Sequence, residues 1–273
     1  MAPAIITAGK HRPMALIVHG CEGVGKTSFA AHAPGVIFIQ TRGEQGLDPL
    51  IESGQVPETP HFQNEAGTFT SLLEETLMWL VKEEHDYKTV VLDTGNGAER
   101  LCHELVCERD YKSDWTNEGF LNYYQGHTTA LTDWQRLLKA FDVLRDRRDM
   151  NVIMLCHTTV RKFSNPEAED YDRYEPAFDS RKTWAITHKW ADCVLFMHQT
   201  TSVVDVDKRS STGKGQGGST TDFFTSRRAP FDAKNRHGLP HQINAGTNGR
   251  EAWQNFITEL KKAKERKYDD TVS

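Results

Sequence analysis

Residues 20–27, which read G-C-E-G-V-G-K-T, carry the clearest chemical signal in the chain. They match the pattern G-x-x-x-x-G-K-[ST], in which glycines let backbone N–H groups turn towards phosphate oxygens. In such a loop Lys26 reaches the β- and γ-phosphates, and the hydroxyl of Thr27 holds Mg²⁺. A strand is predicted just before the loop and a helix just after it, which disfavours a glycine turn without a ligand. We therefore expect ATP and Mg²⁺ as cofactors, with the nucleotide bound by Gly20, Cys21, Glu22, Gly23, Val24, Gly25, Lys26, Thr27 and Ser28.

Two carboxylates and a histidine follow predicted strands and are candidates for metal binding and catalysis. Residues 89–93 (T-V-V-L-D) predict a buried strand ending in Asp93, which can complete a Mg²⁺ site beside a phosphate loop. Hydrolysis also needs a group that orients or deprotonates water, and Asp93 is followed by a threonine, so we assign that role to Glu44. His157 ends the strand predicted over 151–156, where it could sense the γ-phosphate. The alternatives are a solvated turn carboxylate for Glu44 and a core histidine for His157.

Short apolar strands alternate with amphipathic helices, which predicts an α/β fold with a mainly parallel central sheet flanked by helices. The expected strands are residues 15–18, 36–39, 89–93, 151–156 and 193–197. The expected helices are residues 28–33, 69–81, 97–109, 134–144, 183–191 and, at the C-terminus, about 249–267. In the helix over 69–81, Ser71 and Glu74 have the spacing of a capping box.

Three segments do not fit this alternation. Residues 110–131 are polar and aromatic and predict a loop or a short helical excursion, and residues 158–182 predict a long charged loop. Residues 203–206 and 222–225 predict an antiparallel hairpin whose glycine-rich tip, at 210–219, should be flexible. Residues 1–13 predict an irregular lead-in.

The composition excludes several classes of protein. The formal net charge of −5 argues against a basic surface spread over the whole protein, so any nucleic-acid site must be local. The sequence has neither an apolar run long enough to span a membrane nor a secretory signal, and we expect a cytoplasmic protein without membrane contact. The five cysteines are scattered, which is typical of reduced, buried thiols rather than of a zinc site.

Taken in order, several motifs resemble those of the RecA-like P-loop ATPases. They are GCEGVGKT, VIFIQTRGEQGLD, VVLD, VIMLCHT and AKNRHGLP. More narrowly, the chain resembles phage-encoded RecA-like proteins that anneal single-stranded DNA. The resemblance covers about residues 14–240, and it implies a single RecA-like domain over 1–273 and, for a phage protein, a bacterial host cytoplasm.

The same resemblance implies partners and further site residues. Lys234 and Arg236 would project towards the γ-phosphate of a neighbouring subunit in a homo-oligomer, either a ring or a filament; an exposed basic turn is the alternative. Single-stranded DNA would contact the segments 110–131 and 158–182, and a single-stranded-DNA-binding protein is a further expected partner. The implied DNA-binding residues are Arg161, Lys162, Phe163, Tyr171 and Tyr174.

Charge and family pattern each bear on these expectations. Residues 161–182 carry five basic and six acidic side chains, whereas residues 208–236 carry seven basic and two acidic ones, which favours the latter for DNA. Bacterial recombinases place their catalytic glutamate directly after the strand, where Arg42 stands here, so Glu44 departs from the family pattern. The chain also lacks room for their large C-terminal domain.

Two other functions remain open at this point. A P-loop kinase of a small molecule would need an arginine-rich lid and an acceptor pocket. A nucleotide-gated scaffold or helicase loader would bind ATP with little turnover.

Overall fold

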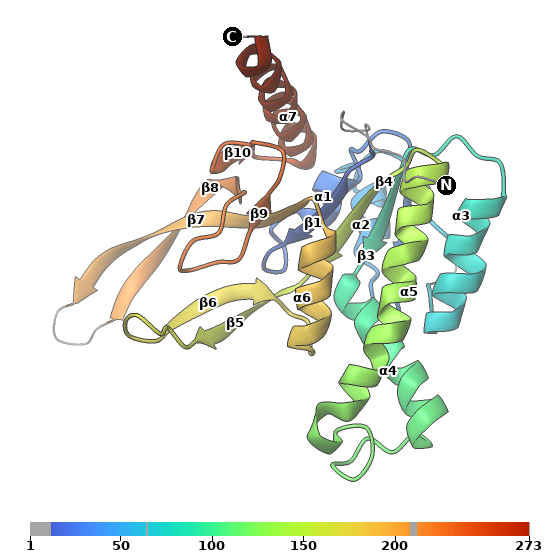
Figure 1. Cartoon of the computed structure of the whole chain (residues 1–273). Helices are drawn as coiled ribbons and strands as arrows, with labels where there is room; N and C mark the ends of the chain where they lie inside the picture. The colour runs from blue at the N-terminus through green and yellow to red at the C-terminus, as the bar shows by residue number, and fades with distance from the viewer. Residues whose placement is uncertain (1–11, 64, 208–211, 273) are drawn as a thin grey trace.

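The computed structural model describes residues 12–272 apart from residues 64 and 208–211, and centres on an eight-stranded sheet (Figure 1). Its strands, in spatial order, are β10 (Gln242–Gly246), β8 (Thr212–Phe224), β7 (Cys193–Asp207), β1 (Ala15–His19), β4 (Asn151–Cys156), β3 (Thr89–Asp93) and β2 (Val36–Gln40), and β9 (Lys234–Asn235) pairs with β7. The strands from β7 to β2 are parallel, whereas β8, β9 and β10 are antiparallel to their neighbours. The predicted α/β fold with a mainly parallel sheet and an antiparallel C-terminal hairpin is confirmed.

Helices cover both faces of the sheet because its strands are apolar on both sides. In β3, for example, Val90 and Leu92 belong to one buried cluster and Val91 to the other, as the two-residue period of a strand requires. On the Val91 side lie α1 (Lys26–Ala30), α2 (Leu47–Glu52) and α7 (Gly249–Val272). On the opposite side lie α3 (Met78–Lys82), α4 (Gly95–Tyr111), α5 (Gln125–Arg147) and α6 (Arg181–Trp190). Each fully buried aliphatic side chain in these layers stabilises the fold by about 1.5–3 kcal/mol.

The strand order determines which side chains meet at the carboxyl edge of the sheet. Strand β4 lies between β1 and β3, with Cys156 opposite His19 and Leu155 opposite Asp93. The residue after β4 is His157, which therefore emerges between the phosphate loop after β1 and the carboxylate at the end of β3. Ligands of open α/β sheets bind at this edge.

The prediction of a long loop over 158–182 is wrong. Strands β5 (Thr158–Phe163) and β6 (Tyr171–Pro176) form a separate antiparallel sheet that projects from the body beside α6 (Figure 1). Most of their side chains are only half-buried or exposed, so the sequence lacks the apolar alternation that identifies a strand. The segment 110–131, predicted as a loop or a short helical excursion, contains the end of α4, a 3₁₀ turn at Asn122–Tyr124 and the start of α5.

Smaller differences concern turns and caps. Helix α2 is not among the predicted helices, and the expected helix over 69–81 is a π-helical stretch, Ser71–Leu77, followed by α3. Its N-terminus is closed by reciprocal hydrogen bonds between Thr68 and Ser71, with N···Oγ distances of 3.0 and 3.1 Å, rather than by Glu74. Most of the predicted glycine-rich tip belongs to β8. Residues 210 and 211 of that tip, residues 208 and 209 before it, and residues 1–11 of the lead-in lie outside the described residues.

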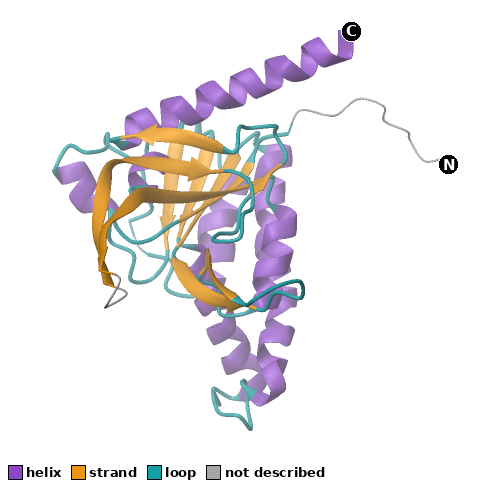
Figure 2. Ribbon diagram, turned by 90° about the vertical axis from the view of Figure 1, so that its left-hand side faces the viewer, coloured by secondary structure: helices purple, strands orange, loops and turns teal. Residues whose placement is uncertain are grey.

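Helix α7 is the last element; it begins against the body of the protein, and its C-terminal part projects away from it (Figure 2). Its first half packs on α1 through Trp253 and Phe256, whose rings lie 5.3 and 5.8 Å from the ring of Phe29. None of the helices in the described part of the chain is long and apolar enough to cross a membrane.

Candidate functional site

The phosphate loop is held against β7 by a backbone contact that only glycine permits. A Cβ atom on Gly20 would lie 2.3 Å from the carbonyl oxygen of Met197, well inside contact distance. Gly25, at the start of α1, has φ of 100°, which favours a residue without a side chain. These two positions explain why the motif needs glycine where the loop leaves β1 and where it enters the helix.

Lys26 lies within the loop rather than in solvent. Its Nζ donates hydrogen bonds to the carbonyl oxygens of Gly20 (2.8 Å) and Cys21 (2.9 Å), and its side chain is buried. Burial lowers the pKa of Lys26, and the nearby carboxylate of Asp93 opposes that shift. The amine is thus held inside the phosphate loop by its carbonyl oxygens.

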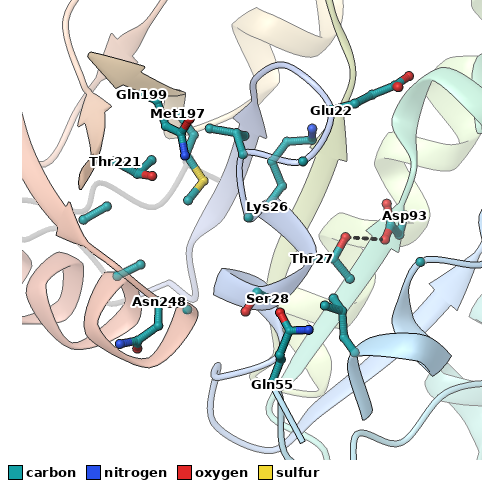
Figure 3. Close-up of a pocket in the computed structure, with 18 of the residues that line it drawn as sticks. Glu22, Lys26, Thr27, Ser28, Gln55, Asp93, Met197, Gln199, Thr221 and Asn248 are labelled. Carbon is teal, nitrogen blue, oxygen red and sulfur yellow. Dashed lines mark hydrogen bonds between the residues drawn. The ribbon is translucent and has the colours of Figure 1, made fainter. Parts of the chain in front are cut away.

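Thr27 and Asp93 form the oxygen pair expected of a Mg²⁺ site. The Thr27 hydroxyl donates to Oδ2 of Asp93 at 3.1 Å, and Asp93 is 6% exposed (Figure 3). Burial, followed by the charge of Glu44, raises the pKa of Asp93 to about 6. A divalent cation would stabilise the ionised form of this buried carboxylate. Proteins commonly hold Mg²⁺ by one or two carboxylates together with substrate phosphates. This pair therefore fits Mg²⁺.

Glu44 and His157 meet across the carboxyl edge of the sheet. Oε1 of Glu44 lies 2.9 Å from Nε2 of His157 and accepts a hydrogen bond from the Thr94 hydroxyl at 3.2 Å. The hydrogen bond with His157 is the main reason why the pKa of Glu44 is lowered, and the same contact raises the pKa of His157. Glu44 is therefore an ionised acceptor at neutral pH, close to Asp93, and neither alternative reading, a free turn carboxylate or an isolated core histidine, describes this pair.

A cavity of about 530 Å³ joins all of these groups (Figure 3). The sequence had identified its phosphate end but not its other walls, which come from α2, from β7 and β8, and from the turn between β10 and α7. The wall residues missed by the sequence include Leu50, Gln55, Met197, Gln199, Thr221, Thr247, Asn248 and Ala252. They are ordinary apolar or neutral polar residues far apart in the chain, so no local pattern marks them.

Lys234 and Arg236 contact another part of their own chain. Nζ of Lys234 donates to carbonyl oxygens at the end of α6, including that of Ala191 at 2.6 Å. Arg236 donates to the carbonyl oxygens of Ala191 (3.3 Å) and Lys189 (3.2 Å). Cations at this position satisfy the free carbonyl groups and the negative end of a helix. Neither residue lines the nucleotide cavity of its own chain.

Three of the aromatic residues predicted to bind DNA pack against other side chains of the protein. The rings of Phe163 and Tyr171 lie 5.2 Å apart, and the guanidinium of Arg173 lies 4.0 and 5.7 Å from their centres. Tyr174 stacks on Phe196 with ring centres 5.3 Å apart. The two predicted basic residues differ: Lys162 is exposed and pairs with Asp170 at 3.3 Å, and Arg161 donates to the carbonyl oxygen of Phe178.

Arg161 also lines a second cavity, of about 550 Å³, which we term the tip cavity. It lies between the connection from α4 to α5, strand β5 and the start of α6. Its lining residues are Tyr123, Tyr124, His127, Arg161, Asp179, Ser180, Arg181 and Lys182. The segments that form this cavity were among those expected to contact DNA, but the tyrosines were not, because no sequence pattern distinguishes them from core aromatic residues.

The two tyrosines of the tip cavity are exposed although the turn that carries them is tightly packed. Tyr123 is 91% exposed and Tyr124 is 70% exposed, and both have positive φ (44° and 59°). Below them the fully buried Phe120 contacts the rings of Trp115 and His127 at 4.9 and 5.0 Å. Bulky residues seldom adopt this backbone conformation, and such outliers are a reason to look for a function.

The pKa of Asp93 gives a prediction about metal binding. Because the ionised carboxylate binds Mg²⁺ and the protonated one does not, affinity for Mg²⁺ should fall about tenfold for each pH unit below about 6. Titrating Mg²⁺ into the nucleotide-bound protein between about pH 5 and about pH 8 measures this. Asp93→Asn should bind Mg²⁺ weakly throughout this range, and a wild-type affinity independent of pH would contradict the assignment.

Comparison with known proteins identifies the family of this chain. A family model described as an AAA domain (AAA_24) matches residues 12–237. Among solved structures, the chain is similar to the crystal structure of the RadB recombinase, with 12% sequence identity, a TM-score of 0.48 and coverage of 89% of this chain and 91% of that chain. None of the curated protein sequences matches. Because the family model matches well over half of the chain, the chain belongs to the AAA domain family and is a P-loop ATPase.

Proposed function

We propose that this ATPase binds single-stranded DNA and uses ATP hydrolysis to control that binding during annealing or strand exchange. One observation carries the proposal: the chain runs directly from the candidate hydrolytic site to the tip cavity, which is basic and aromatic. His157 belongs to the first, and β5, which begins at the next residue, carries Arg161 to the second.

Hydrolysis is assigned to the groups at the edge of the sheet. Lys26 and the loop N–H groups bind the phosphates, and Thr27 and Asp93 would hold Mg²⁺. When bound, Mg²⁺ neutralises charge that develops on the phosphates. Glu44 orients a water molecule and accepts its proton, while His157 keeps that carboxylate ionised and aimed at the cavity.

DNA binding is assigned to the tip cavity because its side chains suit a strand without sequence preference. Tyr123 and Tyr124 offer exposed rings on which bases can stack. Arg161, Arg181 and Lys182 supply positive charge for phosphates, against one acidic residue, Asp179, in the same lining. This positive region is local, as the negative charge of the whole chain requires.

Two contacts from α4 support coupling between the two sites. Asn96 accepts a hydrogen bond from the backbone N–H of His157 at 2.7 Å. One turn further along α4, the buried Glu99 accepts hydrogen bonds from the N–H groups of Asp179 (2.6 Å) and Ser180 (3.1 Å), which line the tip cavity. A shift of His157 on nucleotide binding would therefore reach the DNA-binding side chains through the first turns of α4.

Other parts of the proposal rest on the family resemblance. They are a homo-oligomer with nucleotide between subunits, a phage origin and a single-stranded-DNA-binding protein as partner. For Lys234 and Arg236 to act on a neighbour's phosphate, they would have to leave the end of α6, where both are hydrogen-bonded. A ligand-dependent increase in molecular size, measured with and without ATP and single-stranded DNA, would support assembly.

Fluorescence anisotropy with a labelled single-stranded oligonucleotide tests the DNA role. Binding should depend on ATP and weaken steeply as salt is raised, because phosphate contacts release counterions. The same samples should form ADP without any added acceptor, which a small-molecule kinase would not do. Absence of ATP-linked, salt-dependent binding to DNA would contradict the proposal, and preferential binding of an RNA of the same sequence would reassign the ligand. Binding without turnover would instead favour a scaffold or loader.

A further inference from the structure

The nucleotide cavity continues past the phosphate loop into a compartment beside Ser28 (Figure 3). Leu50 and Gln55, from α2 and the chain just after it, form one wall. Residues 245–249, the turn between β10 and α7, form the other. Ser28 is the residue directly after the phosphate motif, so this compartment is where a bound nucleotide would place its ribose and base.

The position of the second wall is fixed by a close contact. A Cβ atom on Gly249 would lie 2.4 Å from both the carbonyl oxygen and the hydroxyl oxygen of Ser28, so only glycine allows this approach. Asn248 then caps α7, because its Oδ1 accepts from the N–H of Glu251 at 3.0 Å. In return the Glu251 carboxylate accepts from the N–H of Thr247 at 2.8 Å.

Because of these contacts, two backbone N–H groups of the turn are not available to form a hydrogen bond with a base. The N–H of Thr247 is used by Glu251, and the N–H of Gly246 donates to Oδ1 of Asn244 at 2.8 Å.

The side-chain amides that line this wall and the facing one are those of Asn248 and Gln55. Because Oδ1 of Asn248 accepts from Glu251, Asn248 offers a base only its Nδ2 donors, and both purines carry acceptors for them. The Gln55 amide donates to the Ser53 hydroxyl at 2.9 Å but is exposed, so it can rotate to donate or to accept.

The compartment is also uncharged. The charged or titratable groups that line the described cavity are Glu22, Lys26, Glu44, Asp93 and His157, all of them at the phosphate end. Guanine presents N–H donors where adenine presents an acceptor, and a carboxylate would favour guanine through charge-assisted hydrogen bonds. The compartment has no such group, and Leu50 offers an aliphatic surface to either ring.

We propose that the base lies between Leu50 and the turn at 245–249, and that the compartment accepts adenine and guanine nucleotides alike. The inference rests on the proposed function, since it concerns the same nucleotide. Its physical basis is that an N–H donor that either purine can accept from, together with an exposed amide that can rotate, discriminates weakly, whereas a charged partner rejects the wrong base by a large factor.

Equilibrium binding of Mg²⁺–ATP and Mg²⁺–GTP to the full chain tests the inference. The two dissociation constants should agree within about tenfold. A larger difference would overturn relaxed selectivity while leaving nucleotide binding intact. If neither nucleotide binds, or if Lys26→Ala leaves both affinities unchanged, the proposed function and this inference fail together.

A carboxylate introduced into the compartment by mutation tests whether the base lies there. Asn248→Asp keeps an oxygen that caps α7 and adds a carboxylate to the compartment, so it should raise the GTP-to-ATP affinity ratio by about tenfold or more. Asn244→Asp is the matched control, because Asn244 also accepts from a backbone N–H but is exposed and outside this cavity. Its ratio should not change. Gln55→Glu provides the same test from the facing wall, and unchanged ratios in both compartment variants would place the base elsewhere.

Discussion

Replacing Glu44 with glutamine should lower the rate of ATP hydrolysis by about 10²–10⁴-fold while nucleotide affinity stays within a few-fold of wild type. Glutamine has nearly the same shape and can still accept from the Thr94 hydroxyl, but it cannot take a proton from water. Release of inorganic phosphate measures the rate, and calorimetry measures the affinity. Because binding and catalysis are separated, the result distinguishes a catalytic base from a residue that only shapes the cavity.

The control for this variant is Glu52→Gln, an exposed change of the same kind in α2 outside the nucleotide cavity. It should leave both quantities unchanged. If Glu44→Gln hydrolysed ATP at a rate within tenfold of wild type, the base would have to be another group, or turnover would not be the main activity. The second outcome would return attention to the nucleotide-gated scaffold.

Replacing both Tyr123 and Tyr124 with alanine should weaken binding of single-stranded DNA by about 30- to 10⁴-fold. The estimate takes about 1–3 kcal/mol for each base stacked on an aromatic ring. Both side chains are largely exposed, so their loss removes little buried surface and the fold should be retained. Anisotropy with a labelled oligonucleotide measures the affinity, and circular dichroism checks the fold.

The double phenylalanine variant at these positions is the matched control. It keeps the rings and removes only the hydroxyl groups, so DNA affinity should remain close to that of wild type if stacking is the main contribution. Equal, large losses in both variants would indicate that the tyrosine hydroxyl groups, not the rings, make the contact. If the double alanine variant bound single-stranded DNA with wild-type affinity, the tip cavity would not be part of the DNA-binding site.

Much of the hydrolytic site could be predicted because parallel strands end at one edge of a sheet. The phosphate loop, Asp93 and His157 each follow an apolar run, so placing three strands in one parallel sheet brings them together. Glu44 is offset from its strand, and the turn from Thr41 to Glu44 returns its carboxylate to the same edge. The unexpected element was the direct contact of Glu44 with His157, which depends on β4 lying between β1 and β3.

The rest of the site could not be predicted from local patterns. The base compartment depends on Gly249 approaching Ser28, two residues far apart in sequence. The hairpin β5–β6 carries polar side chains on both faces, so it lacks the periodicity of a buried strand. Lys234 and Arg236 stood in a motif that suggested a neighbouring subunit, whereas the carbonyl groups that they contact become available only once α6 is formed.

The central claim is that ATP hydrolysis and single-stranded DNA binding are coupled in this chain. The most direct test is the rate of ATP hydrolysis measured with and without a saturating single-stranded oligonucleotide. The account predicts a DNA-dependent change in rate for the wild-type protein, and no such change when Tyr123 and Tyr124 are alanine. A wild-type rate that is the same with and without DNA would contradict it.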